Sequence, residues 1–406
     1  MNANAAIPLA ACADQALQHL ARASRSAAFA SLDGTTLLGE RAMRAGLTIP
    51  GRTSAGAGCR LYDALGDTVA LNLARPADRE LLPALFETDE LDPNDASAIA
   101  AHIARIDAKA LVSRGRSMGL AIAAEHEMAA PAGSASELSA PSGSPACVEL
   151  ACGCPTSARK HPAPRVIDLS ALWAGPLAAH LLWLAGAEVI KVESRSRPDA
   201  MRDAEGDFYA LINQGKACVG VDLADPIDRQ ALLSLIALSD IVIEAARPRA
   251  LMQHGIDADQ IVHTTSGLVW ISITAHGSRG EAAGWVGFGD DCGVAAGLSA
   301  ALRSASGRSG FVGDAIADPL TGLFAALAAW EAWESGGGAR LGLAMTQVVA
   351  RCLDAAREAD PDALRACLIA WAGAVGKPFP TVTRRSIGPA PAFGGDLRSY
   401  VAQLAR

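Results

Sequence analysis

Short apolar runs alternate with helical patterns along the second half of the chain. Six runs rich in Val, Ile and Leu have the length of strands, and they cover residues 165–169, 188–193, 218–223, 240–244, 268–273 and 340–345. Between them, residues 176–184 and 226–238 show the apolar spacing of helices. This alternation predicts an α/β fold with a Rossmann-like, doubly wound and mostly parallel sheet.

The first part of the chain has a different pattern. Residues 59–62 and 68–73 flank Gly66 as a hairpin would, and residues 78–86 and 96–114 have helical spacing. This predicts a smaller α+β unit over about residues 28–128, N-terminal to the large sheet. The predicted division is therefore a small α+β domain with an N-terminal helix (1–128), a linker rich in Pro, Gly and Ser (129–164), a large domain (165–350) and a C-terminal tail (351–406).

Composition narrows the class of protein. Half of the 406 residues are hydrophobic and 19% are charged, which is typical of a folded chain with a large core. The formal net charge of -8 and the aromatic content of 4% argue against nucleic-acid binding. No uninterrupted apolar run approaches the roughly 18 residues of a membrane span. The first basic residue is Arg22, so we expect no signal peptide, no membrane association and a cytoplasmic location.

Two cofactor classes lack support in the sequence. Cys147, Cys152 and Cys154 lie near His161, but a C-x4-C-x-C spacing differs from the C-x2-C pairs of zinc sites and favours loop thiols. We therefore predict no metal. The turn after the first strand has no G-x-G-x-x-G, so a dinucleotide-dependent oxidoreductase is only a minor alternative.

Candidate chemistry gathers where ligands bind in open α/β sheets, beyond the carboxyl ends of the strands. Basic residues at the strand ends, among them Arg195, Lys216 and Arg247, could meet an anionic ligand. Farther along, Asp318 and Pro319 precede an apolar helix, which predicts Asp318 as its N-cap and Pro319 as its first residue. A carboxylate in that place is stabilised in its charged form and can attack an acyl carbon.

Several blocks in this region resemble the class III CoA-transferases (the CaiB/BaiF type). These include formyl-CoA and carnitine CoA-transferases, and the family also includes α-methylacyl-CoA racemases. The blocks resemble the family in order and spacing over about residues 165–345. They are Val166-Ile167-Asp168-Leu169-Ser170, Ala174-Gly175-Pro176, Gly186-Ala187-Glu188-Val189-Ile190-Lys191-Val192-Glu193, Asn213-Gln214-Gly215-Lys216, Val221-Asp222-Leu223, Asp240 to Glu244 with Arg247-Pro248, and Asp318-Pro319-Leu320-Thr321-Gly322.

The resemblance implies a function and a set of site residues. It assigns the nucleophile to Asp318, with Asp314 as a second choice, and implies CoA transfer from an acyl-CoA to a carboxylic acid through covalent aspartyl intermediates. It implies no cofactor beyond CoA itself, and a homodimer. Asp290 is the expected acidic neighbour in the active site. The implied CoA contacts are Trp173, Arg195, Lys216 and Arg247.

The chain also departs from the family pattern. Gly39-Glu40-Arg41 and residues 67–72 resemble the start of a small domain that normally follows the large one, yet here they precede it. Ala245-Ala246 replaces a frequent Asn-Phe pair, and Phe288-Gly289 stands near the place of the racemase histidine. His276 is close in sequence but is interpreted as a loop residue. Two alternatives therefore stay open: a degenerate acyl-CoA-binding protein without turnover, and a 2-methylacyl-CoA racemase.

Overall fold

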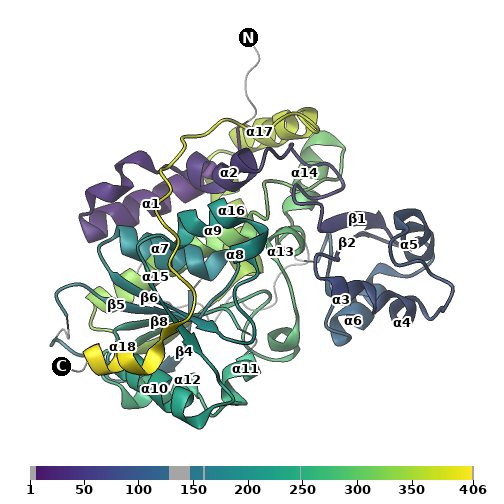
Figure 1. Cartoon of the computed structure of the whole chain (residues 1–406). Coiled ribbons are helices and arrows are strands. Elements are labelled where there is room, and N and C mark those ends of the chain that lie inside the picture. The colour runs from purple at the N-terminus through teal and green to yellow at the C-terminus, as the bar shows by residue number, and fades with distance from the viewer. Residues whose placement is uncertain (1–5, 128–146, 159–160, 247, 405–406) are drawn as a thin grey trace.

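The computed structural model of the chain describes residues 6–127, 147–158, 161–246 and 248–404 (Figure 1). Its large sheet has eight strands in the order β11-β7-β6-β5-β8-β9-β10-β4. All neighbours are parallel except β4, which is antiparallel to β10. The strands are β4 (Cys147–Cys152), β5 (Arg165–Asp168), β6 (Glu188–Ser194), β7 (Ala217–Val221), β8 (Ile241–Glu244), β9 (Val269–Thr274), β10 (Ala339–Ala344) and β11 (Gly395–Asp396).

Helices cover both faces of this sheet. Val166 and Ile241 point into a core shared with α7 (Ala174–Leu184) and α15 (Ala317–Glu334). The next residues along the same strands, Ile167 and Val242, point into the core under α10 (Pro226–Ala237) and α12 (Ala258–Thr264). Strands buried on both faces need near-continuous apolar sequence, which explains the runs of Val and Ile. The predicted mixed α/β architecture with a mostly parallel sheet is confirmed, and all six predicted strands agree with β5–β10 to within two residues at each end.

The smaller unit is built on a three-stranded antiparallel sheet, β1-β2-β3. It comprises β1 (Cys59–Asp63), β2 (Thr68–Asn72), β3 (Ala121–Ala124), α3 (Pro76–Arg79), α4 (Leu82–Phe86), α5 (Ala96–Ile103) and α6 (Ala108–Ser117). The predicted hairpin is present. Each of the two predicted helices is divided in two. The second is interrupted at Asp107, because the Asp107 carboxylate accepts a hydrogen bond from the Ala110 amide at 3.0 Å and starts a new helix, α6.

The first 50 residues do not belong to the core of this smaller unit. Helices α1 (Ala10–Ser24) and α2 (Gly34–Arg44) lie across the large unit in Figure 1, and the buried Leu17, Leu20 and Leu37 join its core. The short helix η1 (Ala27–Ser31) connects them. The boundary of the predicted N-terminal domain therefore differs from the observed packing, because the apolar faces of both helices are buried against α15 and its neighbours.

The predicted linker also contains ordered structure. Residues 147–152 form β4, which adds an antiparallel edge strand beside β10. Gly153 follows directly, and it passes so close to the carbonyl oxygen of Val262 that a side chain would not fit. Residues 128–146 and 159–160 of the predicted linker lie outside the described residues.

The predicted C-terminal tail forms an integral part of the fold. After α16 (Met345–Ala359) and α17 (Pro361–Gly373), the chain runs back across α2 and α7 in extended form (yellow in Figure 1). Arg385 in this extended segment forms an ion pair with Glu40 of α2 and contacts His180 Nε2 of α7 at 2.8 Å. Strand β11 then pairs with β7, and α18 (Leu397–Leu404) packs on α10.

The remaining helices of the large unit are short. They are α8 (Met201–Ala204), α9 (Gly206–Asn213), α11 (Pro248–Met252), η2 (Glu281–Gly284), α13 (Gly289–Ala295) and α14 (Leu298–Ser306). No helix in the described part of the chain combines the length and the apolar character that crossing a lipid bilayer requires.

Candidate active site

Four aspartates converge at the start of α15. Asp290 and Asp291 come from the first turn of α13, Asp314 lies in the turn before α15, and Asp318 lies in its first turn. The pKa of each is raised by burial, and the negative charge of a neighbouring carboxylate adds to the effect in all four. A cluster of carboxyl groups held out of water is typical of an active site, although structural networks also produce it.

Asp318 is the second residue of α15 rather than its N-cap. The helix begins at Ala317, so the predicted start, with Pro319 as the first helical residue, was wrong by two positions. A tight turn precedes the helix: Ala315 has a left-handed φ of 41°, and its carbonyl oxygen accepts a hydrogen bond from the Asp318 amide at 2.8 Å. Non-glycine residues rarely adopt such a conformation, and it fixes the direction in which Asp318 leaves the helix.

A glycine lies directly against the Asp318 carboxyl group. A methyl group at Gly289 would overlap both Asp318 Oδ2 and the carbonyl oxygen of Ala315. The backbone N–H of Ala174, at the start of α7, donates a hydrogen bond to the same carboxyl group. Helix α7 can come this close because Gly322 of α15 has no side chain to meet the carbonyl oxygen of Ala174.

The acidity of Asp318 is set by opposing influences. Burial and the charge of Asp290 raise its pKa to about 7, while Arg41 and the Ala174 amide act in the opposite direction. Asp290 is itself buried, and its pKa is raised to about 6, first by burial and then by Asp314. Its Oδ1 accepts a hydrogen bond from the Ala315 amide at 3.1 Å, which ties α13 to the turn before α15. The predicted proximity of Asp290 and Asp318 is thus present in the structure.

Arg41 of α2 brings positive charge to this cluster. Its Nη1 donates to both oxygens of Asp314, at 2.6 and 2.7 Å, and its Nε and Nη2 bind Glu205 at 2.8 and 2.6 Å. The guanidinium also lies over the Trp173 ring, 5.1 Å from the ring centroid. Asp314, the second candidate nucleophile, is therefore 1% exposed and held by both oxygens. The sequence did not identify Arg41 as a site residue, although Arg41 lies in the family-like block Gly39-Glu40-Arg41.

Trp173 is buried at the N-terminus of α7. Its ring packs edge-on against Phe208, with centroids 5.0 Å apart, and receives Arg41 on one face. The side chain thus forms a wall of the site behind Arg41. In this arrangement Trp173 supports the charge cluster and offers little surface to a CoA molecule.

Lys216 was expected to contact CoA, but the structure buries its side chain completely. The ammonium group donates to Asp168 Oδ2 at 2.9 Å, to the Pro176 carbonyl oxygen at 2.8 Å and to Asn213 Oδ1 at 2.8 Å. An ammonium with three bonds to the protein has no donor left for a phosphate. Burial lowers its pKa to about 8 against the attraction of Asp168. Lys216 thus holds the start of α7 to β5.

Replacing Lys216 should destabilise the fold. We expect Lys216→Met to lower the free energy of unfolding by about 3–5 kcal/mol, because it leaves the buried carboxylate of Asp168 with one cation fewer. Arg195→Gln is the matched control. Its side chain is 43% exposed and its Nε lies 3.8 Å from Asp228 Oδ2, so its removal should change stability by no more than about 0.5 kcal/mol. Chemical denaturation of both variants measures the difference, and equal stabilities would contradict the structural role of Lys216.

The other expected CoA contacts are placed differently. Arg195 directly follows β6 and is partly exposed at the carboxyl edge of the sheet, with its Nε 3.8 Å from Asp228 Oδ2. Arg247 lies outside the described residues. His276 follows β9 and packs edge-on against Trp285, 5.6 Å between centroids, and burial lowers its pKa to about 3.

A cavity of about 1090 Å³ opens between the two units. It lies between α6, the hairpin turn at Gly66 and the segment of the large unit that carries Glu281 and Trp285. Arg116 forms part of its wall, with its guanidinium 4.1 Å from the centroid of Trp285 and an ion pair of 2.5 Å to Glu127. The cavity has the size of a small-molecule pocket, and its lining does not include Asp318.

Part of the chain is similar to known CoA-transferases. Residues 164–360 match the family described as CoA-transferase family III. The chain is 29% identical over 201 residues to the succinate–glutarate CoA-transferase of Agrobacterium fabrum, covering 45% of this chain and 50% of that protein. It is 29% identical over 184 residues to the succinyl-CoA–D-citramalate CoA-transferase of Chloroflexus aurantiacus, covering 43% of this chain and 46% of that protein.

A similar solved structure is the hypothetical protein Rv3272 of Mycobacterium tuberculosis, with 27% identity and a TM-score of 0.44, covering 49% of this chain and 61% of that one. The chain spans about half the length of the curated relatives it matches.

Proposed function

Residues 164–360 match CoA-transferase family III, and from this premise we propose that the protein moves CoA from an acyl-CoA donor to a carboxylic acid acceptor. The observation that carries the proposal is Asp318, a partly buried carboxyl group in the first turn of α15 with a backbone N–H, an arginine and a second carboxyl group around it. A carboxylate so placed is shielded from bulk water and can act as a nucleophile toward a thioester.

The proposed reaction proceeds through four acyl transfers. The Asp318 carboxylate attacks the thioester carbonyl of the donor, giving a mixed anhydride and CoA thiolate. The thiolate attacks the aspartyl carbonyl, which releases the donor acid and leaves an Asp318–CoA thioester. The acceptor carboxylate displaces the thiolate to form a second anhydride, and the thiolate then takes the acceptor acyl group and frees Asp318. Each step forms one acyl bond and breaks another, so no redox cofactor is consumed.

The residues around Asp318 have distinct roles in this scheme. The N–H of Ala174 and the charge of Arg41 stabilise the carboxylate that leaves in the last step. The negative charge of Asp290 has the opposite effect. It raises the pKa of Asp318 and so keeps the Asp318 carboxylate nucleophilic. Arg195, at the carboxyl edge of the sheet, is our proposed contact for an anionic part of CoA. We also propose a homodimer, as the family resemblance implies.

Intact-protein mass spectrometry tests the proposal directly. The wild-type chain is incubated with a panel of acyl-CoAs that begins with succinyl-CoA, the donor named for one relative. A covalent adduct with the mass of CoA or of the acyl group, removed by hydroxylamine, is the expected result. Tight CoA binding without an adduct, and without exchange of CoA into free acids, would instead support the degenerate binding protein.

The reaction should depend on pH through Asp318. Its pKa of about 7 lies above the ordinary value, so the reactive carboxylate form is lost as pH falls through 7 and gained as pH rises. We expect kcat/KM for the donor to increase about tenfold per pH unit below 6 and to level off above 8, because kcat/KM follows the ionisation of the free enzyme. Asp290→Asn should move the midpoint to lower pH, since it removes the neighbouring negative charge. An unchanged midpoint in that variant would contradict the proposed coupling.

A further inference from the structure

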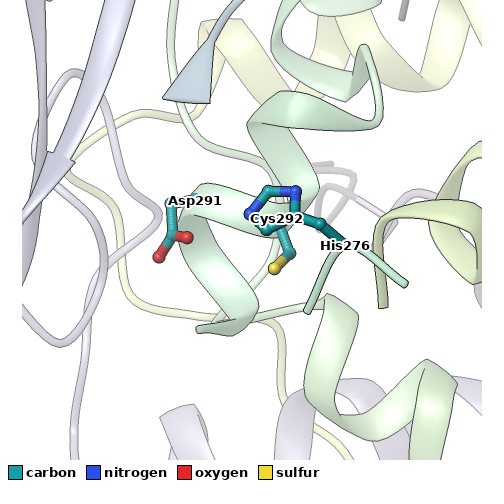
Figure 2. A group of neighbouring side chains, drawn as sticks. All are labelled: His276, Asp291 and Cys292. Carbon is teal, nitrogen blue, oxygen red and sulfur yellow. The ribbon is translucent and has the colours of Figure 1, made fainter. Parts of the chain in front are cut away.

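Three side chains that bind metals through different atoms meet beside the carboxylate cluster. They are His276 from the segment after β9, and Asp291 and Cys292 from the first turn of α13 (Figure 2). One ligand atom from each, a ring nitrogen, a carboxylate oxygen and a sulfur, lies within 4.8 Å of the other two. The ligands of a tetrahedral metal ion are roughly 3.3–3.7 Å apart, given metal–ligand distances of about 2.0–2.3 Å, so small side-chain rotations would complete such a site.

An unsatisfied nitrogen distinguishes this cluster. His276 Nε2 is buried and has no hydrogen-bond partner among the described residues. A buried ring nitrogen without a partner is costly, and a bound cation is one of the explanations it calls for. The Cys292 sulfur is also weakly engaged, since its hydrogen-bond contact is the carbonyl oxygen of Ala275 at 3.8 Å.

The space between the ligands is kept free by a glycine. A Cβ atom built on Gly287 would lie 2.7 Å from Cys292 Sγ and 2.9 Å from Asp291 Oδ2. Any other residue at this position would fill the region that the two ligand atoms face. Gly287 thus leaves a small cradle between the sulfur and the carboxylate oxygen.

The carboxylate of Asp291 is held in place by groups behind it. Asn72 Nδ2 donates to Asp291 Oδ1 at 3.0 Å, and the Phe288 amide donates to Oδ1 and Oδ2 at 3.1 and 3.2 Å. Hydrogen bonds of this kind orient metal ligands and strengthen metal sites. They leave lone pairs on Oδ2, the oxygen next to the Gly287 cradle.

We propose that His276, Asp291 and Cys292 form a binding site for a zinc-type divalent transition metal with an open fourth position. Nitrogen, oxygen and sulfur ligands together suit Zn²⁺ and Co²⁺, whereas Ca²⁺ and Mg²⁺ require oxygen ligands. The site goes beyond the proposed CoA transfer, which uses no metal. It is also distinct from the sequence-level candidates Cys147, Cys152 and Cys154, two of which are exposed in the described structure.

A second group of possible ligands in the smaller unit is engaged by neighbouring side chains, although Glu125 Oε2 lacks a hydrogen-bond partner among the described residues. Asp67 pairs with His126 at 2.7 Å, and Glu125 binds Ser299 at 2.7 Å and Arg303 at 3.2 Å. This group, which we call the Asp67 cluster, therefore serves as an internal comparison with a similar ligand count but without an orphaned nitrogen.

Titration of the chelator-treated full-length chain with Co²⁺ tests the proposal. We expect one Co²⁺ per chain, intense visible bands of tetrahedral coordination and a sulfur-to-metal charge-transfer band in the near ultraviolet, all displaced by one equivalent of Zn²⁺. Cys292→Ser should remove the charge-transfer band, and the exposed thiol variant Cys152→Ser should keep it. Asn72→Ala should weaken Co²⁺ binding by roughly 10–100-fold.

Four results would overturn the assignment: no binding in the wild-type chain, a spectrum without a sulfur band, a sulfur band that survives in Cys292→Ser, or loss of the spectrum in His126→Ala. The wild-type spectrum alone can overturn the assignment even if a variant fails to fold. His126→Ala, in the Asp67 cluster, should leave the spectrum unchanged. Loss of the Co²⁺ spectrum in this variant would locate the metal in the smaller unit. Because no CoA is present, the outcome is independent of the proposed transferase activity.

Discussion

Asp318→Asn should abolish CoA transfer in a chain that remains folded. The substitution keeps the size of the side chain but removes the nucleophilic oxygen, so neither the anhydride nor the aspartyl thioester can form. We expect kcat to fall by roughly 10⁴-fold or more, the scale seen when an enzyme loses its nucleophile. Intact-mass spectrometry should show no hydroxylamine-sensitive adduct, and the thermal midpoint should stay at or above that of the wild type, because a partly buried acid has been replaced by a neutral amide.

Asp290→Asn is the matched control for this result. The asparagine oxygen can still accept the hydrogen bond from the Ala315 amide, so the turn before α15 keeps its shape. This variant should still form the covalent adduct. An adduct that persists in Asp318→Asn would move the nucleophile elsewhere, with Asp314 as the next residue to replace.

Arg41→Met should impair both folding and transfer. The substitution leaves Asp314 buried without the guanidinium that binds both of its oxygens, and we expect a loss of about 3–5 kcal/mol in the free energy of unfolding. It also removes the positive charge that holds down the pKa of Asp318, so the carboxylate form becomes scarcer near neutral pH. Arg41→Lys keeps the charge but loses the bidentate geometry, and an intermediate effect is expected.

A double variant separates the two effects of Arg41. In Arg41→Met/Asp314→Asn both members of the buried pair are neutral, so much of the lost stability should return. Activity should not return, because Asp318 still lacks its neighbouring cation. Denaturant melts and kcat/KM measured on the same preparations give both quantities. Full recovery of activity in the double variant would show that Arg41 acts only through stability.

The pattern of the sequence was sufficient to predict the six strands β5–β10, because most of their residues are buried and each appears as a short run rich in Val, Ile or Leu. The marginal strands β4 and β11 are more exposed and were not predicted. The helix start at Ala317 was missed because a left-handed alanine, Ala315, begins the turn where a capping aspartate was expected. Asp318 itself was found through its place in a family-like block. The charged residues around Asp318 could not be predicted from its neighbours in the sequence, because Arg41 is separated from Asp314 by 273 residues.

The position of Lys216 illustrates a second limit of sequence reasoning. A lysine just before a predicted strand is usually solvated, and nothing in its immediate neighbours shows that Asp168 and Asn213 close over its ammonium group. Burial of a charge depends on contacts between segments, which periodicity does not report. The same holds for α1 and α2, whose apolar faces are visible in the sequence but whose partner in the large unit is not.

The strands at the two margins of the large sheet lie outside the family-matched region of residues 164–360. Without β11 and β4, strands β7 and β10 would present unpaired N–H and C=O groups that can template pairing with another molecule. The flanking segments therefore act as protection against intermolecular sheet growth. A version of the protein trimmed to residues 164–360 would expose both margins, and its tendency to aggregate would rise even if Asp318 and its neighbours were intact.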